Sequence, residues 1–239
     1  MTTSVSSKSR DGQAARKGDG WQAEKSAITQ RTILDSAVEC LVDEGYSRTT
    51  TALIASRAGV SRGAMMHHFP SRLAVLDAVI HHLHQRRLNE YRTLMKDIDL
   101  AEETLTRSAI KKSVEAAWKY VNLPSFVAYQ ELLAASRTDP ELSDILQHVE
   151  KDFEKHFLRT VKVVFPHWEK LNVLEQAHDL VQFLMQGMAL SHMASRKQAR
   201  AKRIIELVTD QLETLYKNAS EQASHRDAGE KAPRTLSGS

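Results

Sequence analysis

The chain has 239 residues, of which 41% are hydrophobic and 26% are charged, and its formal net charge is +3. This composition is typical of a soluble globular protein, and the net charge is too small for a protein that coats nucleic acid without specificity. Cys40 is the only cysteine, which excludes an intramolecular disulfide framework and a cysteine-based zinc cluster and fits a reducing cytoplasm. Neither a membrane-spanning run nor a secretory leader is expected, and no membrane partner is predicted.

The distribution of glycine and proline predicts an all-α protein. No glycine lies between Gly63 and Gly187, whereas strands would need more frequent turns. The prolines in that stretch are spaced like boundaries between helices. About nine helices are predicted, at 28–44, at a short segment that carries Leu53 and Ile54, and at 61–68, 71–95, 101–122, 124–137, 140–165, 169–194 and 195–217. Residues 1–26 and 218–239 are predicted to be disordered tails because they contain few apolar side chains.

The segment after the first helix has the pattern of a helix-turn-helix motif. A hydroxyl within Ser47-Arg48-Thr49-Thr50-Thr51 can cap one short helix, Ala58-Gly59-Val60 forms a tight turn, and Ser61 can cap the next helix. Between Ser47 and Arg72 there are four arginines, two histidines and no acid, whereas residues 31–46 have one arginine against four acids. This concentration of positive charge favours a DNA-reading surface over an ordinary solvated face.

Several short motifs follow one another in this region: Arg31-Thr32-Ile33-Leu34, Glu44-Gly45-Tyr46, Thr49-Thr50, Ile54-Ala55, Ala58-Gly59-Val60-Ser61, Gly63, His68-Phe69 and Ser71-Arg72. Together they resemble the DNA-binding domain of the TetR family of bacterial transcriptional regulators. The resemblance implies a three-helix DNA-binding domain at 27–87, followed by a helical ligand-binding and dimerisation domain at 88–217. It also implies a cytoplasmic homodimer, most simply a repressor, that a small-molecule effector releases from double-stranded operator DNA.

The resemblance further implies which residues contact DNA. A threonine at the start of the second helix would hold the DNA backbone, and Arg72 would stand at the position of a phosphate contact. Arg62 is the candidate for base readout because arginine pairs well with guanine. Met66 departs from the aromatic residue that is usual in the family. The predicted DNA-binding set is Arg48, Thr49, Thr50, Ser61, Arg62, Gly63, Met66, His67, His68 and Arg72.

The second domain offers a predicted pairing surface and a predicted pocket. Apolar stripes on the last two helices, such as Leu180, Leu184 and Met188, could form a four-helix bundle with a second copy, or could simply complete a monomer core. Aromatic residues and methionines suggest a small hydrophobic or aromatic effector, although each is more commonly plain core. The pocket candidates are Trp118, Tyr120, Phe126, Tyr129, Phe183, Met185 and Met188.

Metal and enzyme chemistry are not predicted. His148, Asp152 and His156 share a helix face, but this spacing arises easily by chance in a polar helix. A di-iron centre needs two Glu-x-x-His pairs, and the chain offers one, at Glu175 and His178. No phosphate-binding loop or nucleophile elbow is present, so no cofactor is predicted. The alternative hypothesis is a helical small-molecule carrier or enzyme whose motif resemblance is accidental.

Overall fold

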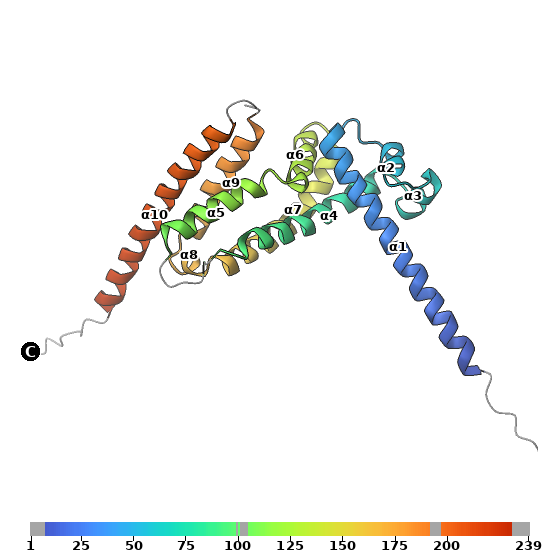
Figure 1. The fold of residues 1–239 in the computed structure, drawn as a ribbon, viewed down its shortest axis with the longest axis horizontal. Coiled ribbons are helices and arrows are strands. Elements are labelled where there is room, and N and C mark those ends of the chain that lie inside the picture. Colours follow the sequence, from blue (N-terminus) through green and yellow to red (C-terminus); the bar gives the residue numbers. More distant parts are fainter. Residues whose placement is uncertain (1–7, 99, 101–104, 192–196, 231–239) are drawn as a thin grey trace, which may run out of the picture. The chain divides into compact units, whose positions relative to one another are not determined.

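A computed structural model describes residues 8–98, 100, 105–191 and 197–230 (Figure 1). Within these ranges the regular structure is entirely helical, which confirms the all-α prediction. Ten helices occur there where about nine were predicted. They are α1 (Lys8–Glu44), α2 (Thr51–Arg57), α3 (Arg62–His68), α4 (Arg72–Met95), α5 (Arg107–Tyr120), α6 (Pro124–Ser136), α7 (Pro140–Val164), α8 (Pro166–Lys170), α9 (Leu174–Leu190) and α10 (Lys197–Glu230). None of the helices in the described ranges is both long and apolar enough to cross a membrane.

The chain divides into two compact units. One consists of residues 1–83 with 128–146, and the other of residues 84–127 with 147–239. The first unit therefore contains α1, α2, α3 and the start of α4. It also includes residues 128–146, which the predicted domain division assigns to the second domain.

The core of the first unit begins with one stripe of α1. Ile33, Ala37 and Leu41 recur at intervals of four residues, so they lie on one helix face, and each is at most 1% exposed. Helix α2 packs against α1, and α3 packs against α2. Gly45 ends α1 with φ = 74°, a left-handed conformation that a side chain would disfavour, and its amide bonds to the Leu41 carbonyl at 3.1 Å.

Helix extends into both segments that the sequence predicts as disordered. α1 begins at Lys8 rather than near residue 28, and α10 ends at Glu230 rather than near residue 217. Elongating a helix whose packed turns are already formed adds one hydrogen bond per residue without a new nucleation step. The structure therefore differs from the prediction over 8–26 and 218–230, while 1–7 and 231–239 lie outside the described residues.

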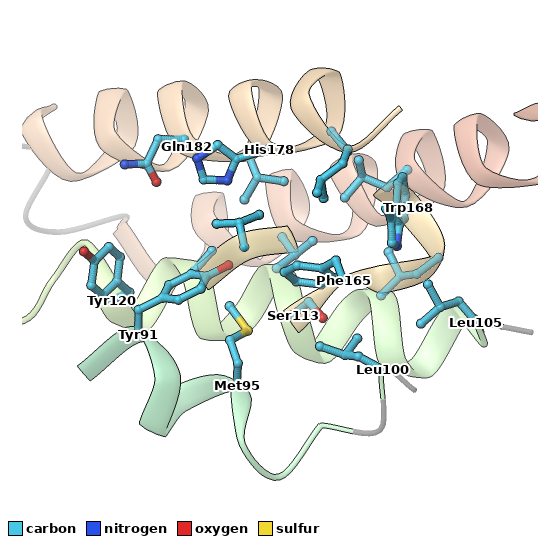
Figure 2. A pocket seen from close by; sticks show the side chains of 18 residues that line it. Tyr91, Met95, Leu100, Leu105, Ser113, Tyr120, Phe165, Trp168, His178 and Gln182 are labelled. Carbon is cyan, nitrogen blue, oxygen red and sulfur yellow. The ribbon is translucent and has the colours of Figure 1, made fainter. Parts of the chain in front are cut away.

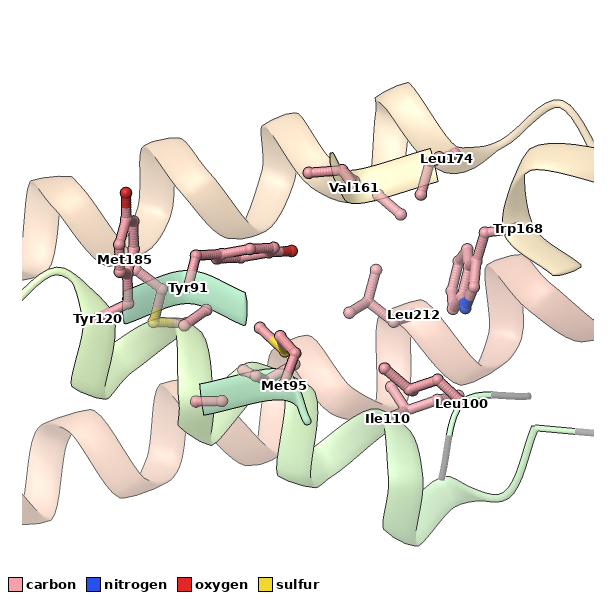
Figure 3. Packing of buried hydrophobic residues seen from close by; sticks show 14 of the residues in the cluster. Tyr91, Met95, Leu100, Ile110, Tyr120, Val161, Trp168, Leu174, Met185 and Leu212 are labelled. Carbon is pink, nitrogen blue, oxygen red and sulfur yellow. The ribbon is translucent and has the colours of Figure 1, made fainter. Parts of the chain in front are cut away.

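The core of the second unit is built from aromatic and aliphatic side chains of seven helices, α4 to α10 (Figure 3). Tyr120 lies near its centre, with ring centroids 5.6 Å from Tyr91 and 5.2 Å from Phe126. Figure 3 labels ten residues of this cluster: Tyr91 and Met95 from α4, Ile110 and Tyr120 from α5, Val161 from α7, Trp168 from α8, Leu174 and Met185 from α9, Leu212 from α10, and Leu100 from the segment before α5.

Two helix boundaries in this unit differ from the prediction. The single helix expected at 169–194 is wrong, because α8 ends at Lys170 and α9 begins at Leu174. Asn172 lies between them with φ = 57°, which a right-handed helix cannot accommodate. α5 begins at Arg107 because the Thr106 hydroxyl caps it, accepting from the Ala109 amide at 3.2 Å. The predicted helical residues 101–104 and 192–196 lie outside the described residues.

Candidate functional site

The helix-turn-helix motif is formed by two short helices, each capped by a hydroxyl. The Thr50 hydroxyl accepts a hydrogen bond from the Leu53 amide at 3.2 Å at the start of α2. Ser61 does the same for the Ala64 amide at 3.1 Å at the start of α3. Gly59 makes the turn between them with φ = 66°. Caps at both starts and a left-handed glycine at the turn set the direction of α3 relative to α2.

α3 has one buried face and one exposed face. Met65 is fully buried and anchors the helix to the first unit, and Phe69 closes the core just after its end. Arg62, Gly63 and His67 are exposed, and Met66 is 39% exposed. A Cβ added at Gly63 would meet only the Ser61 hydroxyl, at 3.9 Å, so this part of α3 presents a low, open surface.

The arginines of the motif differ in their contacts. Arg57 pairs with Asp43 of α1 at 2.6 Å, which holds it against the first helix. Arg48 lies 3.3 Å from Glu44 but is mostly exposed. The guanidinium of Arg72 lies over the ring of Tyr46, 4.6 Å from its centroid. Arg62 projects from the first turn of α3 and is exposed.

The structure brings the predicted DNA-binding residues together in the first unit, with two differences in exposure. Thr49 is 3% exposed, and its hydroxyl donates to the Gly45 carbonyl at 2.8 Å, so it supports the loop after α1. His68 is half-buried beside Phe69, with ring centroids 6.5 Å apart. The exposed members of the set are Arg48, Thr50, Ser61, Arg62, Gly63, Met66, His67 and Arg72.

A cavity of about 620 Å³, part of it open to solvent, lies in the second unit (Figure 2). The space within it that the centre of a water-sized sphere can occupy is about 60 Å³. In Figure 2 the labelled polar side chains Tyr91, Tyr120, His178 and Gln182 lie toward one end, and Trp168 lies toward the other with leucines nearby. The walls come from α4, α5, α7, α8, α9 and α10 and from adjoining residues.

The cavity has an apolar body and an uncharged polar end. No aspartate, glutamate, lysine or arginine is among the described residues that line it. Burial lowers the pKa of His178, and it raises the pKa of the Tyr91 hydroxyl, so both groups favour their neutral forms. The Ser113 hydroxyl already donates to the Ala109 carbonyl at 2.9 Å.

The predicted pocket residues are dispersed in the structure. Tyr120 lines the cavity. Phe126 and Met185 are fully buried in the core, whereas Phe183 is 70% exposed on α9. Trp118 and Met188 are half-buried against the core of the second unit, and Tyr129 is buried in the first unit. Sequence reasoning missed Tyr91, Trp168 and His178, whose helical spacing resembles that of ordinary core residues.

The histidine-rich face of α7 shows no metal-site geometry. His148, Asp152 and His156 are exposed, and Nδ1 of His156 lies 2.7 Å from the Asp152 backbone carbonyl. Among the described residues, no group of three His, Cys, Asp or Glu side chains could hold a metal ion.

These contacts define a helix-turn-helix protein with an all-α body. The family model of bacterial regulatory proteins of the tetR family matches residues 33–79, which include α2 and α3. Over these residues the chain is similar to the tetR family.

Several relatives and solved structures are also similar to this chain. The chain is 28% identical over 128 residues to an uncharacterized HTH-type transcriptional regulator of Mycobacterium bovis, which covers 54% of this chain and 63% of the relative. It is 28% identical over 126 residues to the HTH-type transcriptional regulator CymR of Pseudomonas putida, covering 53% and 60%. The matches thus span less than two thirds of these relatives. A structure described as a TetR-family regulator from Mesorhizobium loti covers 80% of this chain and 97% of its own, with a TM-score of 0.64 at 15% identity, which shows a shared fold.

Proposed function

We propose that the chain is a transcriptional repressor of the bacterial cytoplasm that binds double-stranded operator DNA and is released by a small molecule. The observation that supports this proposal most strongly is the way in which α3 is held: Ser61 caps it, the buried Met65 anchors it, and its other face is exposed. A short helix held this way can enter the major groove without losing its contacts to the core. Arg62 on the exposed face is the proposed base-reading residue.

A binding assay with DNA from upstream of the chain's own gene tests this proposal. Arg62→Ala should cost about 1–3 kcal/mol for each recognition helix and relax specificity at one base position. Arg48→Ala is the matched control, because an exposed arginine outside α3 should weaken operator and random DNA alike. If the wild type prefers no sequence over random DNA, the proposal is wrong, and the carrier alternative gains support.

We propose that the operator is read by a homodimer formed through α9 and α10, which pack against each other. Phe183 is 70% exposed, Leu190 is 56% exposed and Leu207 is 54% exposed, so large apolar side chains remain uncovered on both helices. A second copy would bury them. Phe183→Glu should then give a monomer in sedimentation, whereas Leu133→Glu, at an equally apolar exposed site of α6, should remain dimeric.

The cavity supports an uncharged, partly aromatic effector with one oxygen group. A cation would meet no carboxylate there and an anion would meet no lysine or arginine among the described lining residues, and burying an unpaired charge is costly. A hydroxyl or carbonyl could instead exchange hydrogen bonds with His178 or Gln182, while the body packs against Trp168.

Tryptophan fluorescence tests this chemistry in the absence of DNA. We expect 1-naphthol to bind. Naphthalene should bind several-fold more weakly, because it lacks a hydrogen bond worth about 1 kcal/mol. The naphthoate and naphthylmethylammonium ions should bind at least about tenfold more weakly, because their charge would be buried without a partner. Trp168→Phe, which leaves Trp21 and Trp118, should abolish the signal. Equal binding of the charged and neutral probes would contradict the proposed effector class.

A further inference from the structure

Tyr46, in the loop between α1 and α2, connects two segments that are far apart in the sequence. Its hydroxyl donates a hydrogen bond to Oδ2 of Asp139 at 2.5 Å. Its ring lies beneath the guanidinium of Arg72, the first residue of α4, at 4.6 Å from the ring centroid. All three residues belong to the first unit, so the cluster lies within one compact body.

Asp139 is itself fixed by the start of α7. Its Oδ1 accepts from the Leu142 amide at 3.1 Å, which is the geometry of a helix cap, while Oδ2 accepts from Tyr46. The hydrogen bond from Tyr46 and that from the Leu142 amide hold the pKa of the Asp139 carboxyl below its usual value. Burial and the Asp139 contact raise the pKa of the Tyr46 hydroxyl. At neutral pH the donor therefore keeps its proton, and the acceptor remains charged.

A rigid support lowers the entropy that the Arg72 side chain loses when it contacts a phosphate. Its side chain is exposed at the start of α4, where the Ser71 hydroxyl caps the helix by accepting from the Ala74 amide at 3.1 Å. A long arginine side chain that is free to rotate loses conformational entropy when it contacts a phosphate. An aromatic face beneath the guanidinium removes part of that freedom before DNA arrives.

We propose that Tyr46 is a positioning residue for DNA binding, with its ring holding Arg72 toward the DNA backbone and its hydroxyl fixed by Asp139. The inference rests on the proposed function, since Arg72 must reach a phosphate. Tyr46 need not touch DNA itself. A purely structural tyrosine would affect the stability of the first unit without changing the number of phosphates that the protein contacts.

The salt dependence of binding separates these roles, because its slope counts phosphate contacts. The logarithm of the affinity for duplex DNA falls with the logarithm of salt concentration by about 0.9 for each phosphate contact. Between about 50 and 200 mM salt, each positioned arginine therefore adds a loss of roughly 3.5-fold. The probe is a fluorescently labelled, mixed-sequence duplex of about 30 base pairs, with the full-length chain and anisotropy as the readout.

Five variants form the test. Arg72→Ala and Tyr46→Leu should each lower the slope by about 0.9 per DNA-binding domain, and the double variant should show no further decrease. Tyr46→Phe keeps the ring and should retain the wild-type slope to within about half a unit. Asp139→Asn keeps one acceptor oxygen, which can still cap α7, and turns an NH2 group toward the Tyr46 hydroxyl; because the Tyr46 ring remains, this variant should also keep the slope.

Four results would overturn the inference. If Tyr46→Leu kept the wild-type salt slope, Arg72 would need no positioning by Tyr46. If the double variant showed a further full decrease in the salt slope, the two residues would act independently. An unchanged salt slope in Arg72→Ala would show that Arg72 does not contact a phosphate, and it would not contradict the proposed binding of DNA. If the wild-type chain bound no duplex, the proposed function and the inference would fail together. Thermal unfolding of each variant by circular dichroism ensures that slopes are compared between folded proteins.

Discussion

Two neighbouring alanines of α5 provide a matched test of the cavity. Ala117 lines it and is 9% exposed, whereas Ala116 is 5% exposed in the same core but is not among the lining residues. Replacing each with leucine adds the same three carbon atoms to the same helix. The changes in the free energy of unfolding should have opposite signs, because the leucine at 117 enters the open space of the cavity, whereas the leucine at 116 meets close-packed atoms.

The magnitudes follow from burial and packing. Three methylene equivalents at about 0.8 kcal/mol each give Ala117→Leu a gain of up to about 2.4 kcal/mol in the free energy of unfolding. Ala116→Leu should lose about 1–3 kcal/mol through overpacking. For a chain of this size, 1 kcal/mol corresponds to roughly 2–4 °C in Tm. Urea and thermal denaturation followed by circular dichroism measure both changes.

The same pair links the cavity to ligand binding. Ala117→Leu should lose the 1-naphthol signal while keeping the wild-type affinity for operator DNA, because α2 and α3 belong to the other unit. If Ala117→Leu were destabilised as much as Ala116→Leu, the space beside Ala117 would be closed to an added side chain. The assignment of this cavity as the effector site would then be refuted.

Three further predictions concern a helix cap, a left-handed glycine and the half-buried His178. Ser61→Ala removes the cap of α3, so it should lower the free energy of unfolding, measured by urea denaturation, by about 1 kcal/mol. It should also weaken binding to operator DNA, and an unchanged affinity would mean that α3 is rigid without its cap. Gly45→Ala should lower the free energy of unfolding by about 1–2 kcal/mol because φ is 74° there, and an unchanged Tm would contradict that strain. Burial lowers the pKa of His178, so the unfolded chain takes up this proton first as pH falls below about 6.5. Below that pH the free energy of unfolding should decrease by at most about 1.4 kcal/mol per pH unit because of this histidine. His178→Gln should lack this part of the pH dependence. Identical pH profiles of stability for the two proteins would contradict the prediction.

The helix-turn-helix motif could be predicted because its determinants are local. Thr50 and Ser61 each bond to an amide three residues ahead, and Gly59 adopts a left-handed φ within its own residue. Such contacts are encoded by residue type and short spacing, so they can be recognised without knowing what packs nearby. The break at Asn172 is also local, but neither glycine nor proline marks it, and the predicted helix ran through it.

The cavity could not be predicted in the same way. Periodicity indicates which side of a helix faces inward, but not which inward side chains lack a neighbour across the core. Tyr120 and Met185 have similar sequence signals and are both buried, yet Tyr120 lines the cavity and Met185 is not among its lining residues. The difference depends on how six helices meet, including α8, whose separate existence the sequence did not predict.

The sequence by itself determined the helical class, the capped motif and the concentration of arginines at 47–72, since each depends on composition or on neighbours within about four residues. Only the tertiary structure decided how those arginines are supported. Tyr46 meets Asp139 across 93 residues of chain, and Arg72 lies on the Tyr46 ring because α4 starts beside that loop. Contacts of this kind arise when separate helices pack and exclude water, so residue spacing along the chain carries no record of them.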